Sequence, residues 1–245
     1  MTTNVEVLVI GGGQAGLAAG YYLRRAGHRF VILDDQHSPG GAWPHMWPSL
    51  RLFSPADFAS LPGWPMPRWP DGFPPARHVG DYLTGYEARY GLPIERPVRV
   101  QAVRRDGPAL LVDTDRGQWR AHRVISATGT WQRPFRPSYP GAGLFAGRQL
   151  HTVDYRTPTE FTGADVVVVG GGNSAAQLVA EISTVAATTW VTNPSAAVPA
   201  RWCRRPGLVR ARLPPCGGLG CGPARSRWHR RPRGHRDGSG GPRCT

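Results

Sequence analysis

Residues 5–34, VEVLVIGGGQAGLAAGYYLRRAGHRFVILD, decide the fold of this chain. The short apolar run at 5–10 contains β-branched residues and predicts a strand buried on both faces. Three glycines at G-x-G-x-x-G spacing follow, and the Ala-, Leu- and Arg-rich residues 17–26 favour a helix. Residues 30–33 then predict a second strand, which ends in Asp34. This succession of strand, glycine turn, helix, strand and acid is typical of a dinucleotide-binding βαβ unit.

The individual residues of the turn suit a pyrophosphate and a ribose. Gly11 allows the tight turn, Gly13 lets the backbone approach a phosphate, and Gly16 lets helix and strand pack closely. The helix N-terminus offers free N–H groups and a positive dipole end, and Asp34 is placed to accept hydrogen bonds from a ribose. A βαβ turn that packs without any ligand is the alternative. The predicted contacts with the first dinucleotide are Gly11, Gly13, Gln14, Ala15, Gly16 and Asp34.

The same pattern recurs near residue 166. Residues 166–169 are four valines, residues 170–175 read G-x-G-x-x-A, 176–182 start a helix, and 189–192 predict the next strand. A structural repeat without a ligand is the alternative, but two such units fit an enzyme that holds a flavin nucleotide and a nicotinamide nucleotide. The predicted contacts with the second nucleotide are Gly170, Gly172, Asn173, Ser174 and Ala175.

A β-meander is predicted between the two loops, with strands at 98–103, 109–114 and 118–122. A buried strand at 124–126 follows and leads into Ala127-Thr128-Gly129. Two-dinucleotide flavoproteins interrupt their first βαβ domain in this way, so Thr128 and Gly129 are predicted cofactor contacts.

Two further segments could wall the site. Residues 37–55 are rich in Gly, Pro and aromatic residues, and Gly41 and Trp43 are predicted to pass close to the flavin; a surface loop with aromatic packing is the alternative. Residues 77–91 predict a helix that carries three tyrosines at i, i+4 spacing on one face, which we interpret as packing residues. These tyrosines are Tyr82, Tyr86 and Tyr90.

The net charge of +14 is concentrated at one end of the 245-residue chain. Residues 1–192 hold 18 Arg and 15 acidic residues, whereas 193–245 hold 12 Arg, one acidic residue and all four cysteines. The sequence shows neither a long apolar run nor a secretory signal, so a cytoplasmic protein without a membrane span is the default expectation.

The segment before the second loop contains the pattern F-x-G-x-x-x-H-x-x-x-Y. Its four fixed positions are Phe145, Gly147, His151 and Tyr155. This motif resembles the fingerprint of flavin-containing monooxygenases, and the resemblance covers residues 1–192. Similar proteins include small bacterial members, some of them associated with arsenic resistance. The related Baeyer–Villiger enzymes end this motif in Trp-Pro, whereas here Tyr155 is followed by Arg156. This difference favours oxygenation of a heteroatom. A Baeyer–Villiger oxygenase stays the alternative.

The resemblance implies an α/β fold with two Rossmann-like domains, FAD-binding at 1–161 and the start of NAD(P)H-binding at 162–192. FAD would lie on the first loop and NADPH, or NADH, on the second. Hydride would pass to the flavin, and a flavin hydroperoxide formed with O₂ would oxygenate a nitrogen, sulfur or similar atom of a small molecule. No catalytic side chain and no metal are implied, and His151 would organise the linker or pocket. Because residues 1–192 contain no cysteine, a dithiol enzyme of the thioredoxin-reductase type is excluded.

Residues 193–245 depart from this pattern. They contain 9 Gly, 8 Pro and 12 Arg, so we predict that they are disordered. A basic nucleic-acid or metal-binding module is the alternative from another class, although the cysteine spacings fit no paired zinc pattern. Synonymous codons can be chosen for residues 197–209 so that the next reading frame gives RFLPDGVDGRVLF, which looks globular and family-like. We therefore hypothesise a frameshift near Asn193, a truncated second domain, weak FAD binding and little turnover.

Overall fold

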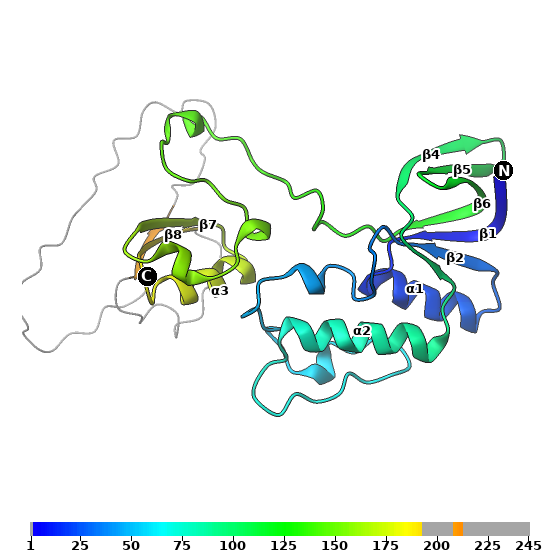
Figure 1. Ribbon diagram of the computed structural model, residues 1–245, viewed down its shortest axis with the longest axis horizontal. Coiled ribbons are helices and arrows are strands. Elements are labelled where there is room, and N and C mark those ends of the chain that lie inside the picture. The colour runs from blue at the N-terminus through cyan, green and yellow to red at the C-terminus, as the bar shows by residue number, and fades with distance from the viewer. Residues whose placement is uncertain (1, 193–207, 213–245) are drawn as a thin grey trace, which may run out of the picture. The chain divides into compact units, whose positions relative to one another are not determined.

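The computed structural model describes residues 2–192 and 208–212, and the chain divides into two compact units, Met1–Thr157 and Pro158–Thr245 (Figure 1). The sequence places this boundary after Phe161 instead. Residues 158–161 form the short 3-10 helix η5 (Pro158–Phe161), which packs against α3 (Asn173–Ile182) and therefore belongs to the second unit.

The first unit is built on a six-stranded mixed sheet. In spatial order its strands are β3 (Ile94–Glu95), β2 (Phe30–Leu33), β1 (Thr2–Ile10), β6 (Gly117–Ser126), β5 (Ala109–Thr114) and β4 (Val100–Asp106). The first four run parallel, and β6, β5 and β4 form the predicted antiparallel meander. The strands expected at 118–122 and 124–126 are one strand, because β6 pairs with β5 along its first half and with β1 along its whole length.

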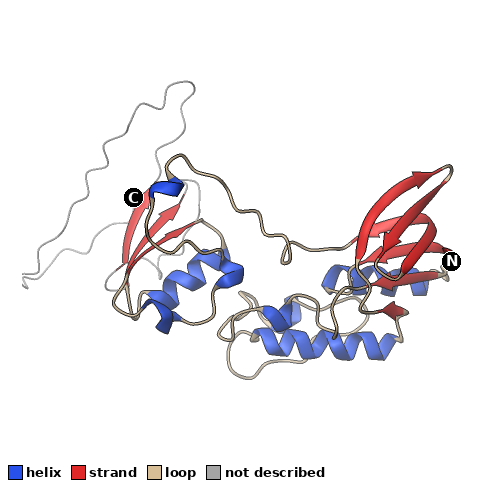
Figure 2. Cartoon of the chain, turned by 45° about the horizontal axis from the view of Figure 1, so that its top comes forward, coloured by secondary structure: helices blue, strands red, loops and turns tan. Residues whose placement is uncertain are grey.

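Both faces of this sheet are covered, as the apolar run of β1 predicts. Val9 and Ile32 face a core with α1 (Gln14–Arg25) and α2 (Ala76–Tyr90), and the two helices lie side by side on that face (Figures 1 and 2). Leu8 and Val31 face the other way and pack with residues of the meander such as Val112. Because successive side chains of a strand point to opposite faces of the sheet, β1 contributes residues to both cores.

The tyrosine face of α2 has the packing role expected of it. The Tyr82 hydroxyl accepts a hydrogen bond from the Leu61 amide (2.7 Å) and donates to the Trp64 carbonyl (2.6 Å). The Tyr86 hydroxyl donates to the Pro62 carbonyl at 2.6 Å. Burial raises the pKa of both phenols, so they stay protonated and keep the proline-rich loop on the helix.

The second unit has three parallel strands in the order β7 (Asp165–Val169), β8 (Ala187–Thr192) and β9 (Leu208–Arg212). Val168 and Trp190 are buried, as are the facing residues of α3, whereas Val167 and Val169 are each 54% exposed. Among the described residues, a helix thus covers one face of β7 and leaves the other open.

Strand β9 lies within the segment for which the sequence predicts disorder, and for Leu208–Arg212 that prediction is wrong. The five residues, LVRAR, include two apolar residues in succession and pair in parallel with Thr188–Thr192 of β8. Pairing satisfies backbone groups at the edge of β8 that would otherwise need other partners. The remaining residues of 193–245, with all four cysteines, lie outside the described residues.

None of the helices in the described ranges combines the length and apolar character that crossing a bilayer requires.

Candidate dinucleotide sites

The first glycine loop is shaped by close backbone contacts that leave no room for side chains. Gly11 has a φ of 105°, and a Cβ there would lie 2.4 Å from the carbonyl oxygen of Ala127. A Cβ on Gly16 would lie 1.9 Å from the carbonyl oxygen of Gly11. The predicted tight turn and the predicted close packing of helix and strand are therefore both present, and both depend on glycine.

The helices that follow the two loops begin without side-chain caps. Gly13 is the N-cap of α1 and Gly172 that of α3; no described side chain caps either helix, and neither first turn carries an acidic residue. The first helical residues of both are exposed, namely Gln14 and Ala15 in α1, and Asn173 and Ser174 in α3. Both helix starts therefore present unpaired N–H groups and a positive dipole end, which fits the pyrophosphate of a dinucleotide.

Other predicted contacts converge on the first loop. A Cβ on Gly41, whose φ is 58°, would lie 2.7 Å from the Cα of Gly13. The Ala127 amide donates to the Ile10 carbonyl at 2.8 Å, which brings Thr128 beside Gly11, with Gly129 next in a left-handed turn. Trp43 begins η1 (Trp43–His45) and packs, partly buried, against the core around α2; its contact with the flavin stays a prediction.

Asp34, at the end of β2, is buried and paired. Its Oδ2 accepts from Nε of Arg96 at 3.1 Å and lies 3.0 Å from Nη2, while Nη1 of Arg96 donates to Glu87 at 2.7 Å. Burial alone would lower the pKa of Arg96, but hydrogen bonds and charge from Glu87 and Asp34 raise it overall. The guanidinium is thus a fixed positive charge between two carboxylates.

The second loop is held by a side chain. Gly170 has a φ of 137°, and its carbonyl accepts a hydrogen bond from the indole Nε1 of Trp190 at 2.7 Å. Trp190 is only 1% exposed, in β8. The small side chain at Ala175 lies at ordinary contact distance, 3.6 Å, from a Cβ built on Gly170. The loop therefore has the turn and helix start that the sequence predicts.

The fingerprint residues organise the end of the first unit. Gly147 lies under the ring of Phe145, and a Cβ there would be 2.5 Å from that ring, so the exposed Phe145 side chain would have to move aside. His151 caps the 3-10 helix η4 (Thr152–Asp154): its Nδ1 accepts from the Val153 amide at 3.2 Å. Tyr155, 3% exposed, meets Trp47 edge to face. This hydrogen bond shows that His151 holds η4; its role as an organiser of the linker or pocket stays a prediction.

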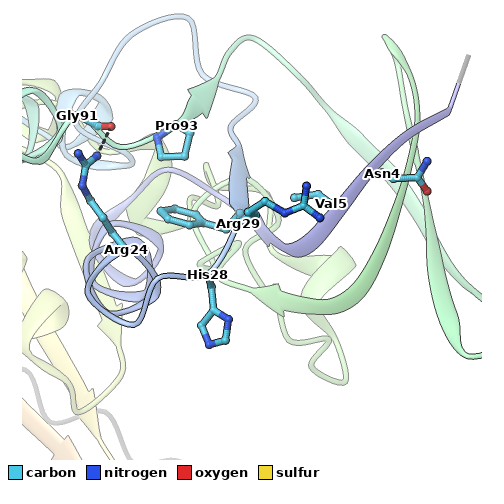
Figure 3. A pocket seen from close by; sticks show the side chains of 8 residues that line it. Asn4, Val5, Arg24, His28, Arg29, Gly91 and Pro93 are labelled. Atoms are coloured by element: carbon cyan, nitrogen blue, oxygen red, sulfur yellow. Dashed lines mark hydrogen bonds between the residues drawn. The ribbon is translucent and has the colours of Figure 1, made fainter.

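A cavity of about 440 Å³ lies elsewhere on the first unit (Figure 3). It is open, and in its wall Arg24 donates to the Gly91 carbonyl at 2.8 Å. Its walls come from the beginnings of β1 and β2 and from residues at or just after the ends of α1 and α2, whereas the glycine loop follows the end of β1. The cavity is therefore separate from the candidate dinucleotide site. It is lined by Asn4, Val5, Arg24, His28, Arg29, Phe30, Gly91 and Pro93.

Within residues 2–192, no three His, Cys, Asp or Glu side chains gather as ligands of a metal ion would.

The sequence-based prediction missed three residues of these sites. Gly12 lies against the Asp34–Arg96 pair, and a Cβ on it would be 2.6 Å from Asp34 Oδ2. The run of three glycines was the available signal. For Arg96 and Trp190 the sequence offers no such signal, because no neighbouring residue indicates which distant group each of them contacts.

Comparisons with known proteins agree with this geometry. A family model described as "Pyridine nucleotide-disulphide oxidoreductase" matches residues 8–201. The structure of a flavin-containing monooxygenase from Stenotrophomonas maltophilia is 54% identical, with a TM-score of 0.78, over 81% of this chain and 60% of that one. An uncharacterized CzcO-like oxidoreductase of Geobacillus kaustophilus is 37% identical over 73% of this chain and 51% of its own length. A Baeyer–Villiger monooxygenase of Streptomyces coelicolor is 32% identical over 73% of this chain and 36% of its own length. The chain thus spans about half the length, or less, of these curated relatives.

Proposed function

Because the chain belongs to the pyridine nucleotide-disulphide oxidoreductase family and is similar to flavin monooxygenases, we propose that it is a flavin-dependent monooxygenase. It would bind FAD, use NADPH or NADH with O₂, and oxygenate a small molecule. One atom of O₂ would enter the product and the other would leave as water, with the nicotinamide nucleotide supplying two electrons.

The pair of uncapped helix starts carries this proposal. Each follows a parallel strand and a glycine with positive φ, Gly11 at 105° and Gly170 at 137°. The first loop also has Asp34 nearby for a ribose, so we assign FAD to it and the nicotinamide nucleotide to the second loop. When bound, these cofactors supply hydride transfer and the activation of oxygen.

The chain's own residues would bind and orient. Backbone N–H groups at Gln14 and Ala15 would hold one pyrophosphate, and those at Asn173 and Ser174 the other. The family name includes disulphide reduction, but residues 1–192 have no cysteine that could exchange with a disulphide. Oxygen transfer, which needs no side-chain nucleophile, is therefore the reaction that we propose for this member.

For the substrate we propose a soft heteroatom, nitrogen or sulfur. The support is the end of the fingerprint, where this chain has Tyr155 and Arg156 and Baeyer–Villiger enzymes have tryptophan and proline. Nη1 of Arg156 donates to the carbonyls of Val153 and Tyr155, both at 2.9 Å. The second candidate is a Baeyer–Villiger oxygenase, which the 32% identical relative favours.

The test uses the purified 245-residue chain with an excess of FAD, because the sequence predicts weak flavin affinity. We expect flavin fluorescence to change on binding, and NADPH and O₂ to be consumed together when a thioether or tertiary amine is added. The expected product is a sulfoxide or N-oxide, whereas an ester from a cyclic ketone would select the second candidate.

Gly13→Val should abolish FAD binding, and Gly172→Val should abolish only NADPH oxidation. Absence of FAD binding at any concentration would refute the proposal.

A further inference from the structure

In the Asp34–Arg96 contact, only one of the two carboxylate oxygens of Asp34 meets the guanidinium. Oδ2 takes both contacts with the guanidinium, at 3.1 Å from Nε and 3.0 Å from Nη2. No residue in the described part of the chain donates to Oδ1, although the Asp34 side chain is only 5% exposed. Oδ1 is therefore the oxygen of this carboxylate that is left to accept a hydrogen bond, and a ligand hydroxyl would donate one to it.

Arg96 is itself held from the other side. Its side chain is 12% exposed, and Nη1 donates to Oε1 of Glu87, on α2, at 2.7 Å. The backbone joins the same elements, since the Asp34 amide donates to the Glu95 carbonyl at 3.0 Å and Val98 donates to the Asp34 carbonyl at 2.8 Å. Glu87 therefore fixes the plane of the guanidinium, and the guanidinium fixes the rotamer of Asp34.

The pair also lies against the glycine loop. A Cβ on Gly12 would lie 2.6 Å from Asp34 Oδ2 and 2.9 Å from Arg96 Nη2. The carboxylate is thus held beside the turn that would carry the pyrophosphate, where the ribose of the same nucleotide must pass.

We propose that Arg96 is a positioning residue of the FAD site: by occupying Oδ2 of Asp34 it presents Oδ1 to the hydroxyls of the adenosine ribose. The inference rests on the proposed function, because it requires FAD on the first loop. The three charged groups, two carboxylates and one guanidinium, carry a net negative charge, so they accept hydrogen bonds from ribose hydroxyls and repel a ribose phosphate.

The test compares ligands that differ only at the ribose. Dissociation constants are measured for FAD, for ADP and for 2′,3′-dideoxy-ADP, with the wild type, Arg96→Met, Arg96→Lys and Arg104→Met. Arg104 pairs with Asp113 in the meander and is the matched control. We expect the wild type to prefer ADP over the dideoxy compound by about ten- to a hundredfold, the value of a hydrogen bond to a charged group.

Arg96→Met should reduce this preference to about threefold or less and weaken FAD binding, because Asp34 is then free to turn. Arg96→Lys should recover part of it, and Arg104→Met should leave it unchanged. The ratio of the two ADP constants does not depend on the fraction of folded protein, so a loss of stability alone cannot produce the effect. An unchanged ratio in Arg96→Met overturns the positioning role while FAD binding by the wild type upholds the proposed function. A wild type that binds none of the three ligands overturns both.

Discussion

A methyl group has no room at position 16, where a Cβ would lie 1.9 Å from a backbone oxygen of Gly11. A backbone atom cannot swing away as a flexible side chain can, so helix and turn must separate. We expect Gly16→Ala to lower the free energy of unfolding by about 2–3 kcal/mol. Gly143→Ala is the matched control, since its Cβ meets nothing within 4 Å, and should change stability by about 0.5 kcal/mol or less. Urea denaturation of both variants measures the difference, and equal stabilities would contradict the packing described.

The 3-10 helix η4 depends on a charge at its end. Asp154 accepts from the His151 amide at 3.0 Å and from Nη2 of Arg136 at 2.8 Å, and these contacts hold its pKa below the ordinary value. Since the folded-state pKa is depressed, the ionised group stabilises the fold above its unfolded pKa of about 4. That contribution is lost as the pH falls through the lower, folded-state value.

Asp154→Asn should therefore be less stable than the wild type near pH 7, and the difference should shrink as the pH falls below about 4. Chemical denaturation over a series of pH values measures it. Asp71→Asn is the control, because Asp71 is exposed and has no ion pair among the described residues. A difference between wild type and Asp154→Asn that stays constant down to pH 2 would show that the carboxylate charge is not involved.

At the scale of the whole molecule, the open question is the reading frame after residue 192. The family model still matches as far as residue 201, and β9 adds a parallel strand at Leu208–Arg212. The frameshift hypothesis stays a prediction. It expects an inserted or deleted base near codon 193, found by resequencing codons 185–245. If the frame is confirmed as written, the Arg- and Cys-rich segment is a genuine part of the protein, and salt-dependent retention on DNA would test the alternative basic module.

The sequence predicts those features that depend on residues within a few positions of one another, and it does not predict contacts between residues far apart in the chain. The glycine spacing, the strands at 5–10 and 30–33, and the helix of the tyrosine face follow from neighbours within a few positions, and the structure has them. Arg96 is 62 positions from Asp34, and Trp190 is 20 positions from Gly170. Only the fold brings these pairs together, so no local pattern could indicate them. Strand β9 was missed because a composition rich in Gly, Pro and Arg outweighed five residues that can pair at a sheet edge.

The two glycine loops should differ in how they respond to substitution, because only the second one is held by a side chain, the indole of Trp190. The first glycine loop is fixed by main-chain atoms of Gly11, Gly16 and Ala127, so a single codon change there either preserves the turn or breaks it. The second loop is fixed in part by a side chain, Trp190, whose hydrogen bond to Gly170 can be altered while every glycine stays in place. With the proposed assignment of the cofactors, substitutions at Trp190 would therefore change the binding of the nicotinamide nucleotide in small steps, whereas substitutions at the glycines of the first loop would abolish flavin binding.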